Sequence, residues 1–268
     1  MQQLYLAGSR MAVSRLAFGT ASLHHVGARD RDRLIGTAVD FGISHFDTSP
    51  YYGNGIGEIG LAALDRRMTV ATKVGLYPPG GAHGSRLRLY ANRALGRILP
   101  QVTRPQVDFS VARARRSLDD SLRRLRRERV DLLFLHEPRQ ELIATQEWQK
   151  WLDSERDRVG LIGVAGELPL LLPIVADGCA LARVIQTRAL AKDAETQALL
   201  SYGRAPHITY GHLASCKDAA AVVDAVRSAF AAEPERVMLV STRRPERIAE
   251  LSRATQSAAG SSRPRLRA

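Results

Sequence analysis

The sequence predicts a single (β/α)8 barrel that is preceded by an N-terminal β-hairpin. From residue 16 onward, eight short apolar runs alternate with segments of helical periodicity in a chain of 268 residues. A helix between consecutive strands implies parallel pairing, and continuous apolar runs are typical of strands that are buried on both faces. Eight such units in about 250 residues are typical of a closed barrel. An open doubly wound sheet is disfavoured, because FGTASLHH (residues 18–25) holds one glycine where the phosphate-binding fingerprint needs three.

The expected elements follow one another in a regular order. Residues 3–20 read as two short strands around a Gly-Ser turn and then the first barrel strand at 16–19, so the hairpin is expected to cap the bottom of the barrel. The other barrel strands are expected at residues 43–47, 68–75, 130–136, 159–166, 182–187, 207–210 and 236–242. Helices are expected around residues 34–39, at 57–66 and 110–130, through Trp148 and Trp151, around Leu170, and at 193–203, 217–232 and 245–254.

The clearest helical pattern lies in the segment 110–130. Its apolar residues recur at spacings of three and four, and Ser110 is the expected N-cap. These apolar residues are Val111, Ala114, Leu118, Leu122 and Leu125. Residues 1–255 are expected to form one domain, and residues 256–268 are expected to form a disordered tail.

The composition indicates a cytoplasmic globular protein. Hydrophobic residues make up 45% of the chain and charged residues 25%, which is ordinary for a soluble domain. The apolar run at 168–176 is too short to span a bilayer, so no membrane association is expected. Cys179 and Cys216 lack metal-ligand spacing, and no metal site is expected. The net charge of +12 comes almost entirely from arginine, without a nucleic-acid-binding motif, so nucleic acid is not an expected partner.

Chemically active residues gather where the barrel strands are expected to end. Asp47 follows the second strand, Lys73 lies in the third, and His136 ends the fourth, while Tyr52 follows Asp47 by five residues. Each residue alone has an ordinary structural explanation, such as a turn cap or a buried core histidine. Together they occupy the face on which barrel enzymes place their active sites. The pattern therefore favours a catalytic site.

The segments that hold these residues resemble a known family. FDTSPYYG, ATKVG and DLLFLHEP are similar to the three catalytic segments of the aldo-keto reductases, which are NAD(P)H-dependent enzymes on a (β/α)8 barrel. The resemblance extends over nearly the whole chain and implies a catalytic tetrad of Asp47, Tyr52, Lys73 and His136. VDFSVARARRSLDDSLRRL further resembles the branch of sugar dehydrogenases that oxidise aldoses at carbon one.

The chemistry of these side chains agrees with the implied roles. Hydride transfer to a carbonyl needs a proton donor, and the reverse reaction needs a base. Tyr52 is the expected general acid and base, with Tyr51 as the alternative, and the ammonium group of Lys73 is expected to lower the tyrosine pKa toward neutrality. Asp47 is the expected counter-ion of Lys73, and His136 is expected to orient the carbonyl.

The resemblance also implies a cofactor site, with NADP(H) preferred over NAD(H). Gln186 matches the family position that contacts the nicotinamide carboxamide, and STRRPERIAEL matches the segment that holds the adenosine phosphate. Tyr210 is given little weight, because the usual stacking tyrosine lies earlier in the sequence, near Arg188. The expected cofactor contacts are Thr20, Gln186, Ser241, Thr242, Arg243 and Arg247.

Two departures from the family pattern leave a second reading open. Ala165-Gly166 replaces the usual Ser-Asn, and the connection after residue 213 is short. Both predict weaker cofactor retention, so the alternative is a catalytically weakened barrel that acts as a cofactor-binding regulatory protein. The expected partner is a small carbonyl compound or sugar. Residues 74–107 carry arginines and no acidic residue, so they either attract anionic substrates or pack on the barrel rim.

Overall fold

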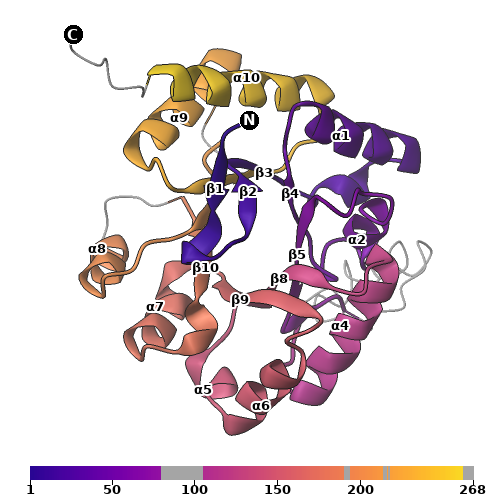
Figure 1. Ribbon diagram of the computed structural model, residues 1–268, viewed down its shortest axis with the longest axis vertical. Coiled ribbons are helices and arrows are strands. Elements are labelled where there is room, and N and C mark those ends of the chain that lie inside the picture. Colours follow the sequence, from indigo (N-terminus) through magenta and orange to yellow (C-terminus); the bar gives the residue numbers. More distant parts are fainter. Residues whose placement is uncertain (80–104, 190–193, 214–215, 217, 262–268) are drawn as a thin grey trace, which may run out of the picture.

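The chain folds as a closed barrel of eight parallel strands, as the sequence predicts. The computed structural model describes residues 1–79, 105–189, 194–213, 216 and 218–261. Within them the strands pair in the order β10-β11-β12-β3-β4-β5-β8-β9, and β9 closes the barrel onto β10. Helices surround the strands in a ring (Figure 1). The barrel strands are β3 (Leu16–Gly19), β4 (His45–Asp47), β5 (Thr69–Val74), β8 (Val130–His136), β9 (Val159–Ala165), β10 (Val184–Arg188), β11 (Ile208–Tyr210) and β12 (Val237–Val240).

Helices follow the strands at the positions that the sequence periodicity indicates. The α-helices are α1 (Ala28–Asp40), α2 (Ile56–Gly60), α4 (Val111–Leu125), α5 (Gln140–Ile143), α6 (Gln146–Ser154), α7 (Leu168–Ala176), α8 (Ala194–Ser201), α9 (Ala219–Ala232) and α10 (Pro245–Ser261). Short 3-10 turns lie at Leu6–Gly8, Leu23–His25 and Ala180–Ala182. The expected apolar stripe of α4 is buried along its length.

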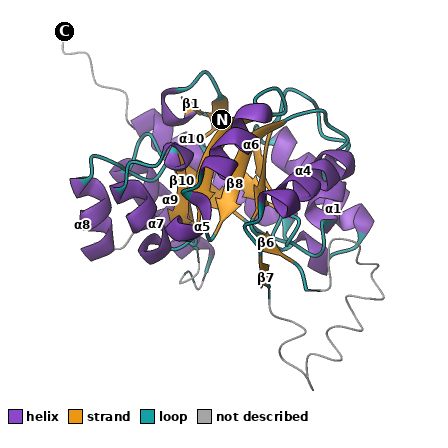
Figure 2. Ribbon diagram, turned by 90° about the horizontal axis from the view of Figure 1, so that it is seen from below, coloured by secondary structure: helices purple, strands orange, loops and turns teal. Residues whose placement is uncertain are grey.

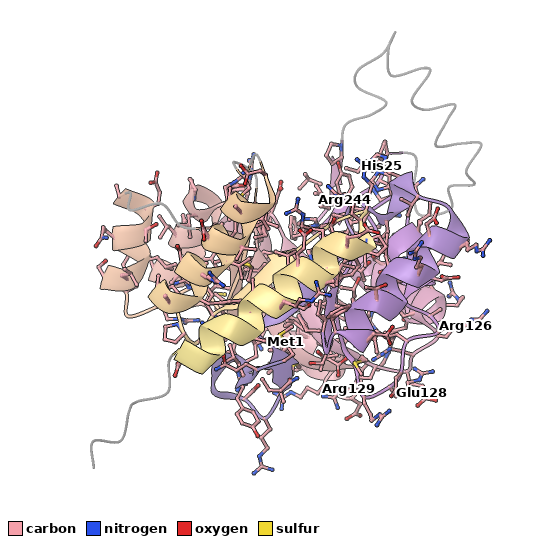
Figure 3. The ribbon with its side chains drawn as sticks, turned by 90° about the horizontal axis from the view of Figure 1, so that it is seen from above. Met1, His25, Arg126, Glu128, Arg129 and Arg244 are labelled. Atoms are coloured by element: carbon pink, nitrogen blue, oxygen red, sulfur yellow. The ribbon has the colours of Figure 1, made fainter. Side chains whose placement is uncertain are left out.

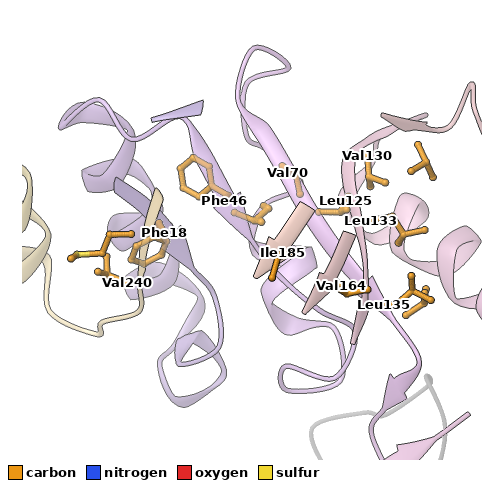
Figure 4. Close-up of a cluster of buried hydrophobic side chains, with 14 of the residues drawn as sticks. Phe18, Phe46, Val70, Leu125, Val130, Leu133, Leu135, Val164, Ile185 and Val240 are labelled. Carbon is orange, nitrogen blue, oxygen red and sulfur yellow. The ribbon is translucent and has the colours of Figure 1, made fainter. Parts of the chain in front are cut away.

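Two apolar layers form because successive residues of a strand point to opposite faces. In β8, Leu132 and Phe134 belong to the cluster inside the barrel, whereas Leu133 and Leu135 belong to the larger cluster between strands and helices. Figure 4 shows part of this larger cluster, including Phe18 of β3. Full burial of one such side chain contributes roughly 1.5–3 kcal/mol. The two layers therefore hold each strand from both sides.

Two antiparallel hairpins lie at opposite ends of the barrel (Figure 2). The first pairs β1 (Gln3–Tyr5) with β2 (Ala12–Ser14), and its residues Leu6 and Val13 pack into the cluster inside the barrel. This confirms the predicted hairpin and closes one end of the barrel. The second pairs β6 (Leu76–Tyr77) with β7 (Gln106–Val107) and was not predicted. It forms the two ends of the long connection between β5 and α4.

Several boundaries differ from the sequence prediction. Helix α2 ends at Gly60 rather than at residue 66, which is consistent with the high conformational cost of glycine in a helix. Ser110 occupies the N-cap position of α4, but its hydroxyl forms no capping bond. The sequence predicts a disordered tail from residue 256, yet α10 continues to Ser261 through a segment that contains good helix-forming alanines.

Candidate active site

The four predicted catalytic residues line one cavity at the carboxyl end of the barrel. Asp47 ends β4, and Tyr52 lies in the loop that follows it. Lys73 is the second-to-last residue of β5, and His136 ends β8. Parallel strands bring their carboxyl ends to one rim, and residues separated in sequence meet there. The cavity has a volume of about 530 Å³. It is lined by Gly19, Ala21, Asp47, Tyr52, Lys73, His136, Glu137, Ala165, Gly166, Gln186, Tyr210, Gly211, His212, Leu213, Leu239, Val240 and Ser241.

Asp47 and Lys73 form the ion pair that the sequence predicts. The Lys73 ammonium donates to Asp47 Oδ2, and both side chains are only 2% exposed. Lys73 Nζ also donates to the backbone oxygen of Thr48 at 3.2 Å, and Gln186 Nε2 donates to Asp47 Oδ2 at 3.0 Å. Burial lowers the pKa of Lys73, while the charge and hydrogen bond of Asp47 oppose that change. A buried ammonium needs such a partner to stay charged.

Tyr52 lies beside this ion pair with its hydroxyl in the neutral form. Its ring centroid is 5.5 Å from Lys73 Nζ and 6.1 Å from the His136 ring centroid. Burial raises the pKa of Tyr52 well above its ordinary value of 10, and Asp47 and Glu137 raise it further. The sequence-based expectation of a lowered pKa is therefore wrong for this structure. The charge of Lys73 is matched by Asp47, whose own negative charge disfavours tyrosinate.

The two adjacent tyrosines differ in whether they line the cavity. The Tyr51 ring lies 6.3 Å from the His136 ring, so distance to the histidine does not distinguish the two tyrosines. Tyr52 lines the cavity and faces Lys73, whereas Tyr51 is not among the lining residues. The loop reaches this geometry through Gly53 and Gly55, both at positive φ, where L side chains are strained. This geometry favours Tyr52 as the proton donor.

His136 is buried and uncharged in this site. Burial lowers its pKa to about 3, and the positive charge of Lys73 contributes to the shift. Its Nδ1 atom has no hydrogen-bond partner among the described residues. A neutral imidazole has one N–H donor and one acceptor nitrogen, so it can donate a hydrogen bond to a carbonyl oxygen without repelling Lys73.

The predicted cofactor residues reach the cavity only in part. Ser241 and Gln186 line it, but the Gln186 amide nitrogen is bound to Asp47. Thr20 is buried with its hydroxyl donating to Thr48 Oγ1 at 2.8 Å, and it does not line the cavity. Its neighbours Gly19 and Ala21 line the cavity instead.

The other predicted phosphate contacts lie at the start of α10. Thr242 Oγ1 accepts from the backbone N–H of Arg244 at 3.2 Å, and Arg243 is exposed. Arg247 Nη1 lies 3.2 Å from Glu250 Oε2, so the two side chains form an ion pair. The angles at this contact do not allow a hydrogen bond. None of these three predicted residues lines the cavity. Arg243 and Arg247 instead place positive charge at the N-terminus of α10, and a helix N-terminus favours anions.

Three lining residues were missed or undervalued from sequence. Tyr210 ends β11, and its hydroxyl donates to Glu167 Oε1 at 3.4 Å, while Glu167 also pairs with Arg188 at 3.0 Å. Burial and Glu167 raise the pKa of Tyr210 to about 12. Glu137 follows His136 with a φ of 53°, and His212 follows β11. Their positions just beyond strand ends were the available signal.

A comparison with protein families decides the relationship of the chain. The family model described as "Aldo/keto reductase family" matches residues 15–163, which is more than half of the chain. The chain belongs to the aldo/keto reductase family. The matched part contains all four residues of the predicted tetrad.

Three curated relatives of this aldo/keto reductase are named as dehydrogenases. L-galactose dehydrogenase of Arabidopsis thaliana is 34% identical over 143 residues, which are 49% of this chain and 37% of that protein. Pyridoxal 4-dehydrogenase of Microbacterium luteolum is 32% identical over 156 residues, covering 49% and 42%. D-threo-aldose 1-dehydrogenase of a Pseudomonas species is 30% identical over 143 residues, covering 49% and 42%. The matches thus span less than half of each relative.

Solved structures match over nearly the whole barrel. Glycerol dehydrogenase of Gluconobacter oxydans has a TM-score of 0.70 at 20% identity, covering 96% of this chain and 94% of that one. An aldo-keto reductase of Bacillus halodurans in its holo form has a TM-score of 0.69 at 16% identity, covering 97% and 96%. These structures share the fold of this family member. None of the helices in the described part of the chain has the length and apolar character to cross a bilayer.

Proposed function

We propose that this aldo/keto reductase catalyses hydride transfer between NADP(H) and a small carbonyl or alcohol, such as an aldose. The observation that carries the proposal is the meeting of Asp47, Tyr52, Lys73 and His136 around one cavity. Tyr52 and His136 are both neutral there, and each can donate a hydrogen bond to the same carbonyl oxygen of a substrate. The sugar dehydrogenases among the relatives support an aldose as the substrate class.

The cavity fits a nicotinamide cofactor in its volume and its lining. Its lining includes small residues at the ends of two strands, Gly19 at the end of β3 and Ala165 and Gly166 at the end of β9, which leave room for a ring system. Tyr210 offers an aromatic side chain, and Gln186 offers an amide. Arg243 and Arg247, at the start of α10, would hold the 2′-phosphate that distinguishes NADP(H) from NAD(H).

The side chains have distinct roles in the proposed reaction. When bound, the nicotinamide supplies the hydride for reduction or accepts it in oxidation. Tyr52 donates its proton to the carbonyl oxygen as negative charge develops there, and it accepts that proton back in the reverse direction. His136 donates a hydrogen bond that orients the same oxygen. Lys73 stabilises the tyrosinate that remains after proton donation, and Asp47 keeps Lys73 charged and in position.

A regulatory role is the second candidate function, and one observation favours it. Ala165 and Gly166 end β9 in the cavity wall, and neither side chain can donate a hydrogen bond to a carboxamide. A protein of this kind would bind the dinucleotide but would not turn over a substrate.

Single-turnover hydride transfer distinguishes the two candidates. The enzyme is mixed with NADPH and a panel of aldoses and small aldehydes, and the loss of absorbance at 340 nm is followed in one turnover. Oxidation of bound NADPH by at least one carbonyl compound is expected. Tight NADPH binding without hydride transfer to any panel member would favour the regulatory role.

A further inference from the structure

A second cavity, lined mainly by arginine, lies at the end of the barrel opposite the active site. Its volume is about 750 Å³. Figure 3 shows the side chains of Arg126 and Arg129 on the side of the molecule away from His25 and Arg244, which follow barrel strands at the catalytic end. The arginines around this cavity come from the turn before β5, the end of α4 and the turn into β8, and they are Arg66, Arg123, Arg126, Arg127 and Arg129. We call this set the arginine cavity.

The positive charge of the arginine cavity is incompletely compensated. Glu128 and Asp131 are its two acidic lining residues. Asp131 Oδ2 accepts from the backbone N–H of Val70 at 2.8 Å and lies 3.5 Å from Arg127, so its carboxylate is already engaged. Arg126 and Arg129 are exposed, and neither forms an ion pair or a side-chain hydrogen bond with the described residues, although the charge of Arg129 acts on Asp131. Two guanidinium groups are therefore available to a ligand.

Support of the α4 end accounts for some of these arginines but not for all. Cations near a helix C-terminus are stabilised by the helix dipole. Arg66 donates to the backbone oxygen of Arg126, and Arg127 donates to the backbone oxygens of Met68 and Asp65 at 3.0 Å each. These bonds tie the helix end to the turn before β5. The guanidinium groups of Arg126 and Arg129 take no part in them.

The backbone at Arg126 gives a second indication. This residue caps α4 in the left-handed conformation, with φ 52° and ψ 40°. Glycine is the usual residue in that conformation, because any Cβ is strained there. The capping bonds use only the backbone of Arg126, so the helix end does not require its long cationic side chain. Among the described residues, the Arg126 side chain has no hydrogen bond or ion pair that would offset this conformational cost.

We infer that the arginine cavity is a second binding site, for a small anion that carries two or more phosphate groups. Guanidinium groups match phosphate oxygens with paired, charge-assisted hydrogen bonds. Arg123 already pairs with Asp120, and the other four arginines against two carboxylates still leave a surplus that a single monovalent anion would not balance. Burial is the main cause of the lowered pKa of Arg127; the charge of Arg66 lowers it further, while Asp131 and Asp65 oppose the shift. This inference does not depend on the proposed catalytic function.

Calorimetric titration of the full-length protein with inorganic pyrophosphate tests the inference. The double variant Arg126→Gln/Arg129→Gln is expected to lose at least about tenfold in affinity, because two charged hydrogen-bond donors are removed. Arg29→Gln/Arg33→Gln on the exposed face of α1 removes the same charge and should stay within about twofold of wild type. Arg243→Gln/Arg247→Gln should also retain the site, which separates it from the proposed cofactor phosphate contacts.

A single glycine substitution separates binding from folding. Arg126→Gly should raise the melting temperature by about 2 °C, because the left-handed backbone is relaxed, and yet weaken pyrophosphate binding. Unchanged affinity in Arg126→Gly and in the double variant would overturn the inference. Equal losses in the α1 control would overturn it as well, since the attraction would then come from net charge alone. Binding of duplex DNA without binding of pyrophosphate would likewise exclude a small-anion site.

Discussion

Tyr51 and Tyr52 are adjacent in sequence but differ in what their rings face. Only Tyr52 lines the cavity and contacts the ammonium group of Lys73 through its ring. We expect Tyr52→Phe to lower kcat by about a hundredfold or more, because general acid catalysis contributes on that order. The dissociation constant for NADPH, measured by fluorescence titration, should stay nearly unchanged. Tyr51→Phe is the matched control, and a large loss of kcat there instead would reassign the proton donor.

After burial, Asp47 and Tyr210, the charge of Glu137 is a further contribution to the raised pKa of Tyr52. Since its negative charge raises the pKa of Tyr52, Glu137→Gln should lower that pKa and move the onset of tyrosinate formation to lower pH. Reduction needs the protonated form, so the reductive rate should be level through neutral pH and decline on the alkaline side. Oxidation needs the tyrosinate, so its rate should rise with pH.

Ultraviolet titration of tyrosinate, with the Tyr52→Phe signal subtracted, measures this shift directly. In Glu137→Gln, the alkaline decline of the reductive rate and the rise of the oxidative rate should both move to lower pH. Glu141→Gln is the control, because Glu141 is exposed on α5 and does not line the cavity. Identical titrations of wild type and Glu137→Gln would contradict the inference that the charge of Glu137 raises the pKa of Tyr52.

At the scale of elements, α2, α4 and β5 are joined by a buried charge. Glu58 of α2 is fully buried, and it accepts from Arg124 Nε at 2.5 Å and from Thr72 Oγ1 at 2.7 Å. Arg124→Met would leave this carboxylate with Thr72 as its one side-chain hydrogen-bond partner among the described residues, beside the more distant charge of Lys73. We expect a loss of about 2–4 kcal/mol in the free energy of unfolding, because an unpaired buried charge is costly.

Chemical denaturation measures this loss, and α4 itself offers the control. Arg123 is the neighbouring residue and pairs with Asp120 in an exposed position. Arg123→Met should cost less than about 1 kcal/mol, as is usual for surface ion pairs. Similar losses in both variants would mean that Glu58 is stabilised by something other than Arg124.

The start of α10 determines cofactor choice in the proposed function. Arg247 lies in its first turn, so Arg247→Ala should weaken NADPH binding by roughly 1.5–3 kcal/mol and NADH binding much less. Arg253, further along the same helix, stacks its guanidinium over Phe41 and serves as the control. Equal losses for both cofactors in Arg247→Ala, or a wild-type preference for NADH, would remove the case for NADP(H).

At the scale of the whole molecule, the fold could be predicted because each barrel strand is a short apolar run and each helix has its own periodicity. The meeting of Asp47, Tyr52, Lys73 and His136 could be predicted because the barrel fixes where strand ends meet, whereas their catalytic roles stay a prediction. The direction of the Tyr52 pKa shift could not be predicted, since it depends first on burial and then on the distances to Asp47 and Glu137, which only the folded chain sets. Thr20 has a suitable residue type, but its hydroxyl turns to Thr48. The arginines of residues 74–107, which are expected to attract anionic substrates or to pack on the barrel rim, lie outside the described residues.

The pairing of β12 with β3 has a consequence for how this protein is made. Met238 pairs with Leu16 and Val240 with Phe18, so the last strand to leave the ribosome must find the first barrel strand. Until then β3 exposes an unpaired edge, which is a template for wrong strand pairing. Contacts of such long sequence separation form slowly, because the loop that they close is almost the whole chain. All four residues of the predicted tetrad are therefore synthesised well before the barrel can close, and the edge of β3 stays unpaired during that interval.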